Sequence, residues 1–161
     1  MIRKLKKPFI IAEIGNNHEG NFENALKLID AAKKSGVDAV KFQTFKTDLF
    51  YSSQDKDRVK RLKKFELSFD QFLKLSQYAK KKKLLFISTP LDLKSLEFLK
   101  KILDIIKIAS GDNNFKDLIK SSIKSNKELI ISTGLTSLKE IKDLKKLIQN
   151  FNHMKKTYFL H

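Results

Sequence analysis

Charged and polar side chains interrupt or end the aliphatic runs of this sequence, where apolar residues alone would be expected. Glu13 lies inside FIIAEIG (9–15), and Lys41 and Gln43 lie inside AVKFQTF (39–45). Two lysine cations, Lys41 and Lys107, and two serine hydroxyls, Ser110 and Ser132, suit the binding of a small phosphorylated or carboxylated anion. A carboxylate beside them suits general acid–base chemistry. The candidate site residues are Glu13, Lys41, Gln43, Lys107, Ser110 and Ser132.

Strand alternation makes these polar residues informative. In a β-strand, Lys41 and Gln43 share one face, while Val40 and Phe42 take the other. Burying a lone Lys or Glu is expensive unless it is paired or bound to a ligand. Structural alternatives stay open. Glu13 and Lys41 could form an ion bridge that needs no substrate. His18 could orient the first loop without taking part in chemistry. Four hydroxyl residues could be helix caps or turn formers. These four are Ser88, Thr89, Ser132 and Thr133.

The elements that would position these residues alternate between strand and helix patterns. Strands are expected at 8–15, 38–45, 84–90, 104–111, 128–134 and 157–161. Helices are expected at 21–36, 68–82, 93–102, 114–126 and after Ser137, with a polar loop over 46–66. Ser68 with Gln71, and Ser137 with Glu140, have the spacing of capping boxes.

This order indicates the α/β class, with a parallel sheet covered by helices. An open doubly wound sheet and a (β/α)₈ TIM barrel both fit. A complete barrel needs about 250 residues. These 161 residues supply about five and a half βα units, so a barrel would be incomplete. No linker or low-complexity segment divides residues 1–161, which we therefore expect to form one domain. In either architecture, ligands bind at the carboxyl ends of the strands.

Composition excludes several other classes of protein. The chain has no Cys, which fits a reducing compartment such as the cytoplasm. No segment has the roughly 20 apolar residues of a membrane span. The net charge is +16, but 31 of the 34 basic residues are Lys, whereas base readout favours Arg. We therefore expect no nucleic-acid or membrane partner. Nucleotide-binding GxxxxGK[ST] and GxGxxG loops are absent.

Four motifs together resemble the N-terminal half of the sialic acid (N-acetylneuraminate) synthase family. They are IAEIGNNHEGN, AVKFQTF, KIASGD and ISTG, in this order and at matching spacing from about Phe9 to His161. The resemblance implies a (β/α)₈ barrel followed by an antifreeze-like domain, usually in a homodimer. It also implies condensation of phosphoenolpyruvate with an N-acetylated amino sugar, similar to N-acetylmannosamine, to give a nonulosonic acid and phosphate.

The same resemblance assigns roles to the candidate residues. Glu13 matches the family's catalytic carboxylate, and Gln43 matches a position near the sugar. The residues matching those that hold phosphoenolpyruvate are Lys41, Lys107, Ser110 and Ser132. The family uses a divalent metal, Mn²⁺ or Mg²⁺, whose ligands would lie beyond His161, so no metal ligand is assigned within these residues. Ala109 and Asp112 depart from the common Pro and Glu.

Other functions stay open at this stage. The chain could belong to another phosphoenolpyruvate-condensing or aldolase-type barrel enzyme. It could also be an inactive half-barrel that binds a ligand or partner. If the resemblance holds, the remaining barrel and the antifreeze-like domain are absent from these residues, and the 161-residue chain alone should not turn over. The amino sugar, whether N-acetylneuraminic, legionaminic or pseudaminic in type, is not determined by these motifs.

Overall fold

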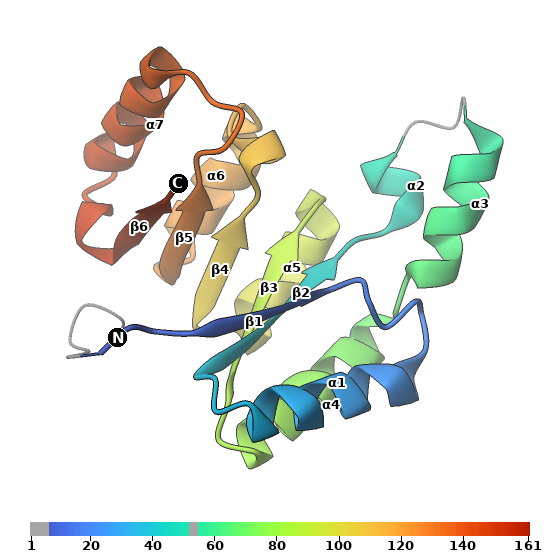
Figure 1. Ribbon diagram of the computed structural model, residues 1–161. Coiled ribbons are helices and arrows are strands. Elements are labelled where there is room, and N and C mark those ends of the chain that lie inside the picture. The colour runs from blue at the N-terminus through green and yellow to red at the C-terminus, as the bar shows by residue number, and fades with distance from the viewer. Residues whose placement is uncertain (1–6, 52–54) are drawn as a thin grey trace.

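Six parallel strands form one sheet in chain order, and this sheet curls into half of a barrel (Figure 1). The computed structural model describes residues 7–51 and 55–161. The strands are β1 (Ile11–Gly15), β2 (Ala39–Thr44), β3 (Leu85–Pro90), β4 (Ile105–Ile108), β5 (Glu128–Ser132) and β6 (Thr157–Leu160). The α/β prediction is confirmed, and the curl favours the barrel over the doubly wound sheet.

Helices cover the outside of the curl, except α2 (Thr47–Phe50) and α3 (Lys56–Phe65), which lie beyond the carboxyl end of β2 (Figure 1). The helices on the outside are α1 (Phe22–Lys34), α4 (Phe69–Lys81), α5 (Leu93–Ile102), α6 (Lys116–Lys124) and α7 (Leu138–Asn150). Two 3₁₀ turns are η2 (Ser110–Asp112) and η3 (Met154–Lys156). Both predicted capping boxes form, at Ser68 with Gln71 and at Ser137 with Glu140. Within the described ranges, no helix is long and apolar enough to cross a membrane.

Residues of alternate parity pack on the two faces of the sheet. On the outer face, Val40 and Phe42 join α1 and α4 in one apolar cluster, and Ile106 and Ile108 join α6 and α7 in a second. The inner face carries a third cluster, built from Ala39, Ile87, Ile105 and Ile130, with Phe9, Ile11, Leu85 and Tyr158 beside it. This inner layer forms the floor beneath the polar strand ends.

The segment 46–66, predicted as a polar loop, contains two helices. Its described residues form α2 and α3 beyond the carboxyl end of β2 (Figure 1). Helix α3 has the sequence KDRVKRLKKF and no buried residue. The loop prediction was wrong. Helices were predicted from a stripe of apolar residues that would be buried in the core, and α3 has no such buried stripe.

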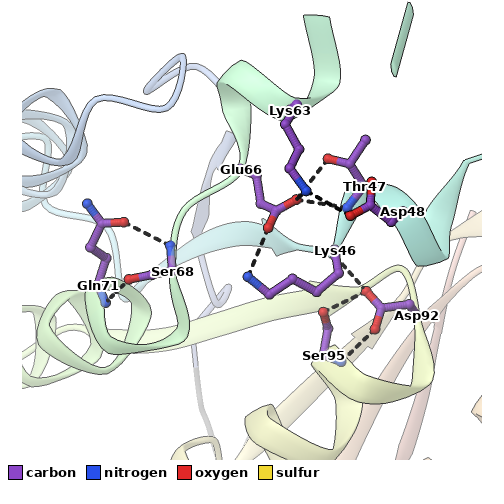
Figure 2. A network of polar contacts seen from close by, with 9 residues as sticks. All are labelled: Lys46, Thr47, Asp48, Lys63, Glu66, Ser68, Gln71, Asp92 and Ser95. Carbon is purple, nitrogen blue, oxygen red and sulfur yellow. Dashed lines mark hydrogen bonds and ion pairs between the residues drawn. The ribbon is translucent and has the colours of Figure 1, made fainter. Parts of the chain in front are cut away.

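Polar contacts attach this helical segment to the barrel (Figure 2). Glu66 accepts hydrogen bonds from the Thr47 backbone N–H and hydroxyl, each at 2.9 Å, and from Lys46 Nζ at 2.9 Å. Burial alone would raise the pKa of Glu66, but these bonds outweigh it and hold the pKa below its ordinary value. Asp92, the N-cap of α5, accepts the Lys46 backbone N–H at 2.8 Å. The chain just after β2 is thereby bound both to Glu66, which follows α3, and to Asp92, which begins α5.

Candidate functional site

Glu13 and Lys41 form an ion pair between the neighbouring strands β1 and β2. They lie opposite each other in the strand register, and Lys41 Nζ lies 2.7 Å from Glu13 Oε2. Lys41 also donates to Thr89 Oγ1 at 3.3 Å. The Lys41 side chain is only 9% exposed, whereas that of Glu13 is 58% exposed. Lys41 is therefore held in place, and the carboxylate is accessible.

Lys107 is a second buried cation on the same inner face. Its Nζ donates to Ser132 Oγ and to the Ile108 carbonyl, both at 2.6 Å. Burial lowers the pKa of Lys107 to about 8, and the charge of Lys41 acts in the same direction, against the opposing effects of Glu13 and Asp112. Lys107 therefore lies within electrostatic reach of the Glu13–Lys41 pair. An anion at this position would relieve the repulsion between the two ammonium groups.

Gln43 lies two residues beyond Lys41, on the same face and nearer the strand end. Its Oε1 accepts a hydrogen bond of 2.7 Å from Asn16 Nδ2. Asn16 follows Gly15, where a positive φ of 55° and a register shift let the chain turn over β1. We call the following set of inner-face side chains the rim cluster: Glu13, Lys41, Gln43, Thr89, Lys107 and Ser132. The sequence did not predict the position of Asn16, because that position depends on this shift.

Ser110 is the one predicted site residue outside the rim cluster. It lies in η2 rather than on strand β4, which ends at Ile108. A Cβ added at Gly134 would lie 3.8 Å from Ser110 Oγ, so the loops after β4 and β5 meet there. Ser110 also lines an outer groove of about 560 Å³ between α6 and α7. Its expected role with phosphoenolpyruvate stays a prediction.

None of the four hydroxyl residues considered as possible caps is a helix cap. They are Ser88, Thr89, Ser132 and Thr133. Ser88 is on the outer face, where its Oγ pairs with Thr44 Oγ1 at 2.7 Å. Thr133 donates to the Leu160 carbonyl at 2.9 Å and lies 3.4 Å from His161 Nδ1, linking β5 to the end of β6. Of the four residues considered as caps, only Thr89 and Ser132 contact the rim lysines.

His18 lies against the first loop and hydrogen-bonds to it. It is fully buried, packs its ring near Phe42, and its Nδ1 accepts the Gly20 backbone N–H at 3.0 Å. Burial lowers the pKa of His18, which favours the neutral ring. Nδ1 accepts a hydrogen bond, so the proton of a neutral ring lies on Nε2.

Asp112 is a titratable group that sequence reasoning noted only as a departure from a motif. Burial raises its pKa, and the nearby Lys107 ammonium opposes that rise. A carboxyl group with a raised pKa within electrostatic reach of Lys107 is a second candidate for proton transfer, besides Glu13. Within residues 7–51 and 55–161, no three His, Asp or Glu side chains gather as a metal site. The described residues therefore do not by themselves fit the metal that the resemblance implies.

Comparison with known proteins places this geometry in a family. The family model described as NeuB matches residues 28–161. The chain belongs to the NeuB family. An uncharacterized protein of Methanocaldococcus jannaschii is 41% identical over 150 residues, covering 92% of this chain and 44% of that protein. The N,N'-diacetyllegionaminic acid synthase of Campylobacter jejuni is 38% identical over 153 residues, covering 86% of this chain and 46% of the synthase.

A solved structure supports the NeuB assignment at the level of the fold. The N-acetylneuraminic acid synthetase of Leptospira borgpetersenii, determined with citrate, superposes with a TM-score of 0.89 at 34% identity. The match covers 95% of this chain and 53% of that one. This NeuB chain spans less than half the length of the two relatives described above. The fold and the family are thus shown.

Proposed function

We propose that the protein containing this chain condenses phosphoenolpyruvate with the open-chain aldehyde of an N-acetylated amino sugar. The products are a nonulosonic acid of the sialic acid type and inorganic phosphate. One observation carries the proposal: two buried lysines, Lys41 and Lys107, lie within electrostatic reach of each other beside the carboxylate of Glu13. NeuB family membership supports it, because the named relatives include a legionaminic acid synthase.

The chemistry assigns a role to each rim group. C3 of phosphoenolpyruvate forms the new bond to the aldehyde carbon, and water adds at C2. The resulting tetrahedral intermediate loses phosphate to leave a 2-oxo acid. Lys41 and Lys107 hold the carboxylate and phosphate and stabilise the charge that develops on them. The hydroxyls of Ser132 and Ser110 donate hydrogen bonds to the same anion.

Glu13 is the group assigned to proton transfer. Its carboxylate is exposed on the open side of the ion pair with Lys41. It takes a proton from the attacking water and returns it to the leaving phosphate oxygen. The second proton of that water leaves the C2 hydroxyl as the 2-oxo group forms and passes through solvent to the former aldehyde oxygen, which becomes a hydroxyl. Gln43, at the end of β2, contacts the sugar. The divalent metal expected for this family is proposed to use ligands other than the described residues, and no step is derived through it.

The test is a product assay on the complete protein that contains these residues. Phosphoenolpyruvate is supplied with N-acetylmannosamine, with diacetamido sugars, or with simple aldose phosphates. Phosphate release that requires an N-acetylated sugar, together with a nonulosonic acid detected by mass spectrometry, is the expected result. Condensation only with an aldose phosphate would favour another phosphoenolpyruvate-condensing enzyme. Release of phosphate with no acceptor present would contradict the proposal.

We also infer that the complete protein is a homodimer that acts in the cytoplasm, where phosphoenolpyruvate is made. The absence of Cys from these residues fits a reducing compartment. Sedimentation of the complete protein tests the dimer, and fractionation of the source cells tests the location. A monomer that retains full activity would contradict the first inference.

A further inference from the structure

Asn16 and Gln43 form a side-chain amide pair in which Asn16 is the donor. The bond from Asn16 Nδ2 to Gln43 Oε1 is 2.7 Å long and joins the turn after β1 to the end of β2. A side-chain amide has one oxygen acceptor and one NH₂ donor. Because Asn16 occupies the oxygen of Gln43, the Gln43 NH₂ group is the end left to donate. Within the described ranges, this nitrogen has no hydrogen-bond partner.

The turn that places Asn16 lies directly over the catalytic carboxylate. Gly15 has a φ of 55°, and a Cβ added there would lie 3.4 Å from Glu13 Oε1. The Asn17 backbone N–H closes the turn on the Ile14 carbonyl at 3.0 Å. Gln43 lies opposite Thr89 in the register, and Thr89 in turn accepts from Lys41. The Gln43 NH₂ group is therefore near the proposed anion site, at the strand end.

The pair carries an energetic cost that packing alone does not explain. Asn16 Oδ1 is buried and has no hydrogen-bond partner among the described residues. Leaving a buried acceptor unpaired costs about 1–3 kcal/mol. An apolar residue at position 16 would avoid that cost but would release Gln43. The arrangement is thus suited to orienting Gln43 rather than to stabilising the turn.

We infer that Asn16 is a positioning residue for the sugar substrate. It holds Gln43 with its NH₂ group toward the substrate, so that this group donates a hydrogen bond to an oxygen of the open-chain amino sugar. Asn16 itself acts only through Gln43. This inference rests on the proposed condensation and names the group that selects the sugar, as distinct from the groups that bind phosphoenolpyruvate.

The test separates the two substrates in steady-state kinetics of the complete protein. Asn16→Ala frees Gln43, and loss of one oriented hydrogen bond raises the KM for the amino sugar about tenfold. The KM for phosphoenolpyruvate stays within about twofold. Asn16→Asp, which is nearly isosteric, can only accept, so Gln43 must turn its NH₂ group inward and present oxygen to the sugar. This variant raises the sugar KM at least as much.

Deoxy analogues of the sugar locate the hydrogen bond. In the unaltered protein, removing the sugar oxygen that Gln43 contacts raises the KM for the sugar about tenfold. In Asn16→Ala, the same removal causes no further rise in this KM. Asn24→Ala is the matched control, because Asn24 is exposed on α1 and its side chain makes no hydrogen bond to the residues that the structure describes.

Three results overturn the inference. The first is an unchanged sugar KM in both Asn16 variants, which leaves the proposed function intact. The second is an equal rise in both KM values, which indicates a structural role. The third is a protein that condenses no amino sugar, which removes the proposed function and this inference together.

Discussion

At the scale of single residues, strand alternation accounts for most of the rim cluster. Glu13, Lys41 and Lys107 share the inner face because each has the parity of the apolar inner layer beneath it. Ser88 has the opposite parity to the inner-layer residue Ile87 and therefore points outward, toward Thr44. Alternation alone could have placed Ser88 correctly. It could not have placed Asn16, which lies beyond a shift in register, or Ser110, which lies beyond the end of its strand.

The pKa of Lys107 predicts how the rate depends on pH. Burial and Lys41 lower this pKa to about 8, so the ammonium is charged below pH 8 and neutral above it. Anion binding is therefore lost as pH rises. We expect kcat/KM for phosphoenolpyruvate to fall above pH 8 by up to tenfold per pH unit, because this ratio reports groups of the free enzyme.

Lys107→Met supplies the control for this pH profile. The variant has no ammonium to titrate, so its lower kcat/KM should not show the break near pH 8. The profile is measured above pH 7, where the substrate phosphate is largely ionised. A break of the same size in the variant would assign the titration to another group.

Glu13→Gln separates proton transfer from substrate binding. The amide keeps the shape but cannot take a proton, so we expect kcat to fall by about 10²- to 10⁴-fold. Lys41 loses its counter-charge, so affinity for phosphoenolpyruvate should be equal or tighter. Single-turnover phosphate release and equilibrium binding measure the two effects. Weaker binding with unchanged turnover would contradict the assigned role.

At the scale of elements, periodicity predicted the sheet and the helices that cover it. Each of these helices has a buried apolar stripe, such as Ala25, Ile29 and Ala32 on α1. Helices α2 and α3 were missed because polar contacts and caps hold them instead (Figure 2). Such contacts join residues that are up to 46 positions apart, such as Lys46 and Asp92, and no local pattern encodes them.

Two glycines provide a matched test of how α3 packs on the barrel. Gly20 has a φ of 77°, and an added Cβ would lie 1.8 Å from the Lys64 carbonyl oxygen at the end of α3. Gly36 has a φ of 75° and nothing within 4 Å. We expect Gly36→Ala to cost about 1–2 kcal/mol from the backbone conformation alone.

Gly20→Ala should cost roughly 3–5 kcal/mol, because the collision adds to the same backbone penalty. Denaturant unfolding of the complete protein measures both values. Equal costs for the two variants would mean that α3 does not lie against the turn after β1 in solution.

At the scale of the whole molecule, the half-barrel has two open strand edges. Within the described ranges, β1 and β6 each pair with one neighbour. The inner apolar layer lies between these edges, with Phe9, Ile11 and Tyr158 only partly buried. Unpaired edges and apolar surface both favour association.

We therefore expect the isolated 161-residue chain to associate or precipitate. We also expect no turnover by the isolated chain, because it spans less than half the length of the two relatives described above. Sedimentation velocity and a condensation assay check the two expectations. A stable monomer, or turnover by the isolated chain, would contradict them.

The central claim is that Lys41 and Lys107, 66 positions apart in the sequence, make one binding site for phosphoenolpyruvate. Calorimetric titration of the complete protein at pH 7 tests it most directly, with Lys139→Ala as a control for an exposed lysine on α7. We predict binding to the unaltered protein and to the control, with Lys107→Ala at least about tenfold weaker. Equal affinity for Lys107→Ala and the unaltered protein, or no binding to either, would contradict the claim.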